Sequence, residues 1–198
     1  MGTSLTRHND LMATLPDAPL TEEQYLEIER LAEYKSEFHD GRMFAMSGGS
    51  LNHALLSSAI NALLYRQMPP GCRTCSSDLR IKVALADLYT YPDCSVICGE
   101  PQYFREHKDV VLNPLLIVEV LPPSTEDYDR GKKFELYRTV ESFREYLIVH
   151  QDRRYVEHYS KQDDGSWVLR DYSDGSFQVD RLGVRISLDE LYSSALNL

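Results

Sequence analysis

The amino-acid sequence predicts an α+β fold, with a mixed β-sheet core flanked by helices. Apolar residues recur at helical spacing after Thr21 and again over 51–68, which is typical of amphipathic helices. Short alternating runs bounded by turn dipeptides such as Asp40-Gly41 indicate strands joined in hairpins. A dense apolar run at 114–121 is typical of a strand in the middle of a sheet.

Length and composition fit one globular domain. The chain has 198 residues, 42% of them hydrophobic, which is too apolar for a disordered chain. We expect a flexible N-terminal arm over 1–20, because this stretch has no periodicity, and a single domain over 21–198. No apolar run approaches the ~20 residues that span a bilayer, and no signal peptide is recognisable, so we expect a cytoplasmic protein without membrane contact. The net charge of −10 disfavours non-specific coating of nucleic acid but leaves room for a local basic groove.

The elements of the first half follow from caps, turns and periodicity. A helix is expected to begin at Thr21, because Thr21 and Gln24 have the spacing of a capping box. The Pro-Pro-Gly at 69–71 stops a second helix. The elements expected after the first helix are strands at 35–39 and 42–46, a helix at 51–68, and strands at 73–76, 79–85 and 92–98.

The second half begins with the central strand at 114–121, which Pro122-Pro123 ends. Turn residues at 151–152, 163–165 and 174–175 divide the C-terminal region. The elements expected there are a helix at 129–139, strands at 145–150 and 155–160, and a short helix at 188–192.

Four cysteines lie at close spacings, Cys72 with Cys75 and Cys94 with Cys98. Without a secretory signal we do not expect a disulfide framework. The spacings leave a zinc site open, but Cys94 and Cys98 fall in YPDCSVIC, which has the pattern of a strand and not of a zinc-binding turn. Alternation places Cys94, Val96 and Cys98 on one strand face as small buried residues, which is the interpretation we favour.

Glu119 is an acid inside the apolar run LLIVEVL. On alternation it shares a strand face with Leu115 and Ile117. A carboxylate in such a strand is destabilising unless it is paired or bound to a cation. A buried ion pair, for example with an arginine, is the structural alternative. We favour a functional site, since acids in such surroundings gather at sites.

Asp93 lies between Pro92 and the apolar run CSVIC. Alone, it fits a turn-capping residue at the start of a strand. Together with Glu119 on an adjacent predicted strand, it forms a pair of carboxylates that can converge on one hard cation.

Lys133 is the third candidate, because it falls in the middle of the apolar face of the predicted helix at 129–139. At about 100° per residue, Leu136, Tyr137 and Val140 define that face. A lysine there needs a partner such as Glu119; otherwise its stem packs while its amine reaches water. Two acids and a lysine around a divalent cation form an arrangement that cleaves phosphodiesters. The cation lowers the pKa of a bound water, and the lysine orients that water or stabilises the charge of the transition state.

These motifs occur in an order that resembles a known enzyme family. YPDCSVIC, LLIVEVLPPST and DYDRGKKFELYR are similar to motifs of the PD-(D/E)XK nuclease superfamily, and more closely to Uma-type restriction endonucleases. The resemblance covers about Thr21 to Tyr192, including YKSEFHDGRMFAMSGGSLNHALLSSAINALL and SLDELY. It implies a restriction-endonuclease-like fold and an endonuclease that requires Mg²⁺ or Mn²⁺ and hydrolyses DNA. Cleavage of both strands of a duplex favours a homodimer.

The resemblance also assigns roles to residues. Asp93 and Glu119 match the two acids that bind the metal ion. The lysine position of the half-motif is Leu121 here, and Lys133 in the following helix matches the displaced lysine. Glu37 matches an additional acid, so the implied catalytic set is Glu37, Asp93, Glu119 and Lys133.

Other positions match the family with less clear chemistry. Asp78 matches an acidic position, and Asn52 with His53 matches an Asn-His pair. For His53 we favour packing or hydrogen bonding at a helix N-terminus. Pro122 departs from the family, which has serine there, and changes the loop between Glu119 and Lys133.

A catalytically inactive nuclease-fold module that acts as a homo-oligomer is the second function class. The 13 tyrosines would suit an interface, although tyrosines also fill sheet faces. Convergence of Asp93, Glu119 and Lys133 would favour the enzyme. The basic residues near the proposed site in sequence, from which a DNA-binding face could be built, are Arg73, Arg80, Lys82, Arg130, Lys132, Lys133 and Arg138.

Overall fold

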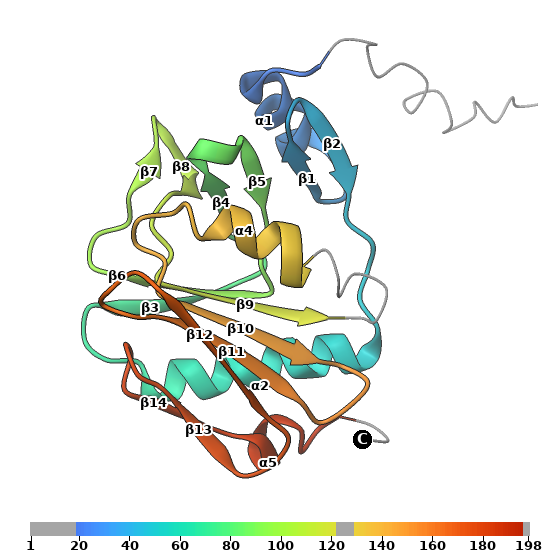
Figure 1. Cartoon of the computed structure of the whole chain (residues 1–198). Helices are drawn as coiled ribbons and strands as arrows, with labels where there is room; N and C mark the ends of the chain where they lie inside the picture. Colours follow the sequence, from blue (N-terminus) through green and yellow to red (C-terminus); the bar gives the residue numbers. More distant parts are fainter. Residues whose placement is uncertain (1–18, 122–128, 196–198) are drawn as a thin grey trace, which may run out of the picture.

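The computed structural model describes residues 19–121 and 129–195 (Figure 1). Its strands form two six-stranded sheets and a separate two-stranded hairpin. The predicted α+β class is confirmed, but the strands are divided between two mixed sheets where the sequence suggested one. Most of the predicted N-terminal arm, and Pro122-Pro123, lie outside the described residues. No helix in the described part of the chain is long and apolar enough to cross a membrane.

The first sheet has the strand order β2-β1-β5-β4-β8-β7. Its strands are β1 (Ser36–His39), β2 (Arg42–Ala45), β4 (Arg80–Val83), β5 (Leu88–Thr90), β7 (Tyr103–Phe104) and β8 (His107–Val111). Helix α1 (Glu22–Leu31) begins with the predicted capping box of Thr21 and Gln24. It packs through Tyr25 and Leu26 against Phe38 and Tyr89 of this sheet. The strand expected at 79–85 is shorter, because Ala84–Ala86 forms a 3₁₀ turn.

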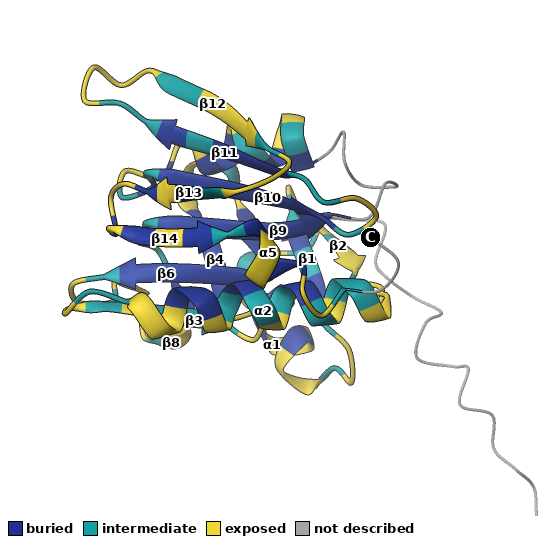
Figure 2. Ribbon diagram, turned by 90° about the horizontal axis from the view of Figure 1, so that it is seen from below, coloured by how far each residue is buried: buried dark blue, intermediate teal, exposed yellow. Residues whose placement is uncertain are grey.

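The second sheet has the strand order β12-β11-β10-β9-β6-β3. Its strands are β3 (Cys72–Ser76), β6 (Cys94–Cys98), β9 (Leu116–Leu121), β10 (Glu145–His150), β11 (Val156–Lys161) and β12 (Trp167–Tyr172). Strands β9 and β10 are parallel, and the other pairs are antiparallel. Strand β9 is buried along its whole length, as its apolar sequence predicts (Figure 2).

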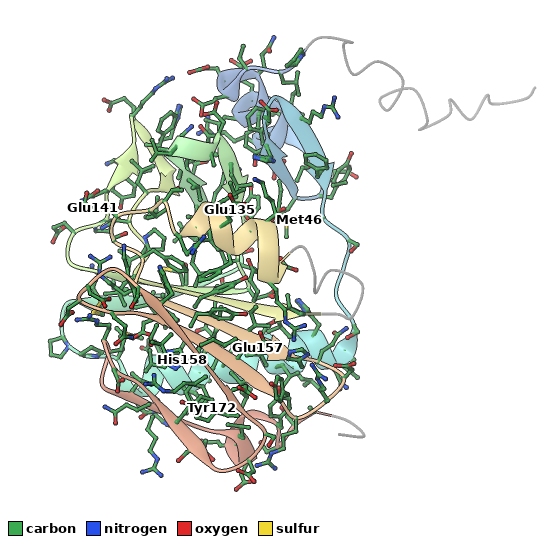
Figure 3. All side chains as sticks on the ribbon, viewed as in Figure 1. Met46, Glu135, Glu141, Glu157, His158 and Tyr172 are labelled. Atoms are coloured by element: carbon green, nitrogen blue, oxygen red, sulfur yellow. A yellow bond between two sulfur atoms is a disulfide. The ribbon has the colours of Figure 1, made fainter. Side chains whose placement is uncertain are left out.

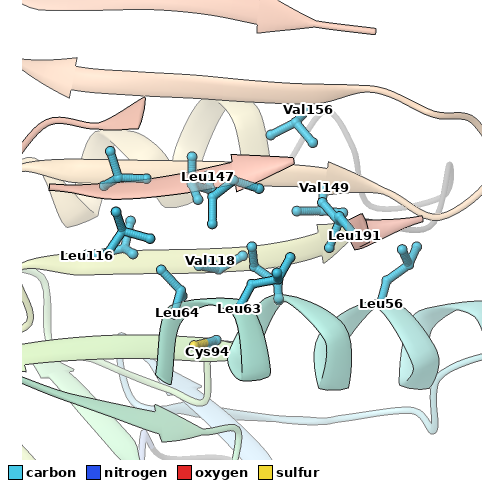
Figure 4. Close-up of a cluster of buried hydrophobic side chains, with 14 of the residues drawn as sticks. Leu56, Leu63, Leu64, Cys94, Leu116, Val118, Leu147, Val149, Val156 and Leu191 are labelled. Carbon is cyan, nitrogen blue, oxygen red and sulfur yellow. The ribbon is translucent and has the colours of Figure 1, made fainter. Parts of the chain in front are cut away.

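One face of the second sheet is covered by helix α2 (Leu51–Gln67) and by the C-terminal elements (Figures 1 and 4). These elements are the hairpin β13 (Ser176–Val179) and β14 (Val184–Ser187), and helix α5 (Leu188–Leu191). Leu116, Val118 and Val120 of β9 point into this core. Ile117 and Leu121 point to the opposite side, so the predicted alternation along β9 is confirmed. Leu115, which precedes the strand, packs on the α2 side, contrary to the prediction.

A short helical segment covers the opposite face. Residues Asp129–Lys133 form a turn of π-helix, and Phe134–Tyr137 continue as α4. The helix expected over 129–139 is therefore shorter and begins with a wider turn. Its buried side meets Tyr146 and Phe143 in an aromatic cluster.

The cysteines correct one prediction. Cys72 and Cys98 are directly paired in the register of β3 and β6, and they form a disulfide. Cys94 is buried beside Val96, as alternation predicts, and Cys75 is a free thiol. Since two of the four thiols are bonded to each other, the four cysteines do not form a zinc site in the described structure.

Candidate active site

The structure brings the four predicted site residues to one cavity of about 500 Å³. Glu37 comes from β1 of the first sheet. Asp93 and Glu119 come from the second sheet, where Asp93 directly precedes β6 and Glu119 lies within β9. Lys133 ends the π-helical turn between the sheets. Met46, which is labelled in Figure 3, also lines this cavity.

Strand register explains why the two motif acids share a face. Strands β6 and β9 are antiparallel, with Cys94 opposite Val118. Continuing that register by one residue places Asp93 opposite Glu119, and directly opposed residues project from the same side of a sheet. The Oδ2 atom of Asp93 accepts a hydrogen bond of 2.8 Å from the backbone N–H of Val120. The backbone therefore ties the position of the first acid to the strand that carries the second.

Lys133 lies at the centre of the acidic cluster, with only 6% of its surface exposed. Its Nζ is 3.0 Å from Glu37 Oε1, 3.1 Å from Glu119 Oε1 and 3.4 Å from Asp129 Oδ1. Burial alone would lower the pKa of Lys133, but these carboxylates outweigh it and hold the pKa well above its usual value. The side chain is therefore an ammonium ion, and the prediction that it points inward to Glu119 is confirmed.

Glu119 is a buried acid whose surroundings shift its pKa strongly. Burial, opposed by Lys133 and reinforced by the nearby carboxylates, raises the pKa of Glu119 to about 8. Its Oε1 accepts a 2.9 Å hydrogen bond from the Tyr137 hydroxyl. The Thr90 hydroxyl donates to Glu37, so the acids on both sides of Lys133 are held by neutral donors.

The donor set suits a hard divalent cation. Glu37, Asp93, Glu119 and Asp129 line the cavity against one lysine, and this leaves an excess of negative charge. Carboxylate oxygens are the ligands of Mg²⁺, which usually keeps several waters and needs only one or two protein carboxylates. Among the described residues, no three His, Cys, Asp or Glu side chains are grouped to hold a metal. The opposed carboxylates of Asp93 and Glu119 could hold such a cation together with water.

Two residues of the cluster are missed by sequence reasoning. Asp129 is 5% exposed and lines the cavity. At the start of a predicted helix an aspartate looks like an ordinary first-turn residue, but its position four residues before Lys133 was the available signal. The sequence pattern places Tyr137 only on the apolar face of the helix, yet its hydroxyl donates a hydrogen bond to Glu119.

The other family positions lie differently. Asp78 pairs with Lys35, and its side chain is 84% exposed outside the cavity. The Asn52 amide donates to the Gln151 carbonyl at 3.3 Å. His53 is a hydrogen-bonding residue at a helix N-terminus, as expected, but its partner is Asp93: Nε2 lies 3.2 Å from Oδ1. The hydrogen bond to Asp93 raises the pKa of His53.

The expected basic face is smaller than the sequence suggested. Lys82 is buried against Glu22, and Arg80 is buried against Tyr91 and Asp109. Two further members of the set, Arg130 and Lys133, pair with carboxylates. The members that remain exposed are Arg73, Lys132 and Arg138.

Comparisons with known proteins show the family to which the chain belongs. The model of the Uma2 family, described as "Putative restriction endonuclease", matches residues 22–190. An uncharacterized protein of Synechocystis sp. is 36% identical over 187 residues, covering 92% of this chain and 97% of the relative. A second Synechocystis protein, also uncharacterized, is 39% identical over 153 residues, covering 76% of this chain and 85% of the relative.

The fold is also similar to that of a solved structure. It is a crystal structure described as a putative nuclease belonging to DUF820, from Anabaena variabilis. It matches with a TM-score of 0.71 at 20% identity and covers 90% of this chain and 100% of its own. At this identity the match concerns the fold alone, and it confirms the restriction-endonuclease-like architecture expected from the motifs.

Proposed function

Since the chain belongs to the Uma2 family, we propose that it is an endonuclease that hydrolyses DNA phosphodiester bonds with Mg²⁺ or Mn²⁺. The observation that carries the proposal is the gathering of Glu37, Asp93, Glu119 and Lys133 around one cavity. An interaction module has no need for a buried acidic cluster that raises the pKa of its central glutamate to about 8.

The position of each site residue suggests its role in the proposed reaction. Asp93 and Glu119 would hold the cation, because they are the opposed pair on β6 and β9. When bound, the cation neutralises phosphate charge and lowers the pKa of a bound water. Lys133 supplies a fixed positive charge beside Glu119, where it orients the attacking water or stabilises the developing phosphorane charge. Glu37 holds that ammonium from the other side at 3.0 Å.

Plasmid nicking tests the proposal. The parent should nick DNA with Mg²⁺ or Mn²⁺ and not with EDTA. Glu119→Gln keeps the shape of the side chain but removes the charge, so cleavage should fall by orders of magnitude. Glu135→Gln is the matched control, because Glu135 is an acid on α4 whose side chain is 61% exposed.

Two outcomes would change the proposal. Undiminished cleavage by Glu119→Gln would remove Glu119 from the mechanism. A parent that cleaves neither DNA nor RNA would favour the inactive, homo-oligomeric module.

We also propose that the active form is a homodimer, since two-fold symmetry presents one site to each strand of a duplex. Sedimentation of the protein with and without DNA tests this point.

A further inference from the structure

His53 and Asp93 are in contact at the wall of the candidate active site. The imidazole Nε2 lies 3.2 Å from Asp93 Oδ1, and the two side chains are 24% and 14% exposed. Both residues line the 500 Å³ cavity and also a neighbouring cavity of about 610 Å³ along α2. The pair therefore stands where the two cavities meet.

The start of α2 holds the backbone of His53 and leaves room for its ring. Its backbone N–H donates to the Ser50 hydroxyl, which caps α2 at 3.1 Å. Gly49 lies against the other ring nitrogen: a Cβ added there would be 2.5 Å from Nδ1 and 2.7 Å from Cγ. Any larger residue at position 49 would push the ring away. Gly49 thus leaves room for the observed ring position, in which Nε2 lies 3.2 Å from Asp93 Oδ1.

Asp93 is in turn held at both oxygens. Oδ1 meets His53, and Oδ2 accepts the backbone N–H of Val120. Each carboxylate oxygen has two lone pairs, so one on each oxygen is left for a cation. A hydrogen-bond donor on this side fixes the orientation of the Asp93 carboxylate and leaves the remaining lone pairs open to a cation.

We propose that His53 is a positioning residue, whose Nε2–H holds the Asp93 carboxylate in the orientation in which it shares a cation with Glu119. The inference rests on the proposed function and deepens it by adding a residue to the metal-binding machinery. Mutation of a residue that orients a metal ligand typically lowers metal affinity or activity by about 10–100-fold.

The first test is Mn²⁺ affinity, measured by titration calorimetry on the full chain. His53→Leu removes the donor at similar volume, and we expect affinity to fall at least about tenfold. His53→Gln keeps an N–H at a similar reach and should restore most of it. Arg66→Ala is the matched control, because it removes an ion pair with Glu190 from the other end of α2 and should leave affinity unchanged. Equal affinity of His53→Leu and the parent would overturn the proposal.

The second test needs no metal. Hydrogen exchange of the Val120 amide, measured in EDTA, should accelerate in His53→Leu relative to the amide of Val118, because Asp93 is no longer held against it. The His53→Gln variant should exchange like the parent. Unchanged exchange at Val120 overturns the role of His53. If the parent does not bind Mn²⁺, the proposed metal-dependent function is wrong. The exchange measurement on Val120 still decides whether His53 holds Asp93.

Discussion

Replacing Glu119 by glutamine should stabilise the metal-free protein, although it removes a residue of the site. Glu119 is 5% exposed and lies near the carboxylates of Glu37, Asp93 and Asp129, with Lys133 as the adjacent cation. Glutamine still accepts the hydrogen bond from Tyr137, but it carries no charge into the cluster. The free-energy cost of burying the side chain at position 119 is therefore smaller in the variant than in the parent.

The size of the effect follows from the pKa of Glu119, which burial raises from 4.5 to about 8. The folded protein binds the Glu119 proton more tightly than the unfolded chain does. The stability that this bound proton adds to the folded protein is therefore fully present below about pH 4.5 and is lost as the pH rises through about 8. At about 1.4 kcal/mol per pKa unit, the loss reaches roughly 3 kcal/mol at pH 7 and roughly 5 kcal/mol at pH 9. For a chain of this length that corresponds to a difference in Tm of roughly 10 °C or more at pH 9.

Thermal unfolding followed by circular dichroism in EDTA measures this difference. At pH 5 the parent and Glu119→Gln should unfold at similar temperatures, and at pH 9 the variant should be clearly more stable. Glu135→Gln, which changes an exposed acid on α4, should show no such divergence. A parent that is more stable than Glu119→Gln at pH 9 would refute the reasoning and assign Glu119 to a stabilising ion pair with Lys133.

Two further predictions concern the charged side chains around the π-helical turn. Lys133→Met should abolish nicking and lower the free energy of unfolding at pH 8 by about 3–5 kcal/mol, because it leaves buried carboxylates without their cation; a urea midpoint equal to that of the parent would contradict this. Glu157 (labelled in Figure 3) is buried, but hydrogen bonds from His150 and Arg130 lower its pKa to about 2. The stability that Glu157 adds is present above about pH 4.5 and is lost as the pH falls toward 2, so Glu157→Gln should show a weaker loss of stability over this range in acid unfolding. Identical acid transitions would show that the pair with Arg130 does not contribute.

The position of Lys133 could be predicted because burial depends on the apolar face and not on the exact helix type. The sequence indicated an α-helix, and the structure has a π-helical turn there. Lys133 and Tyr137 still point inward, since residues four apart stay near one another on either helix. Glu119 could be predicted for a similar reason: strand alternation fixes its face before any partner strand is known.

The remaining features depend on contacts between distant segments. The short strands β5 and β7 have three and two residues, too few to show a period. The parallel pairing of β4 with β8 places β7 and β8 in the first sheet, and no local pattern specifies it. The disulfide of Cys72 and Cys98 needs the register of β3 against β6. Likewise, the burial of Lys82 follows from its partner Glu22, which lies on a different element.

The register of β6 and β9 has a consequence for folding as well as for the site. If β9 slipped by one residue against β6, every side chain of β9 would change faces. Glu119 would then be buried against Leu56 and Leu64 of α2, in a core whose described members are apolar side chains. An unpaired carboxylate in such a core costs far more than the native arrangement around Lys133. Glu119 thus destabilises the native pairing of β6 and β9, but it destabilises the shifted pairing more. This difference favours the one alignment of the two strands in which the site forms.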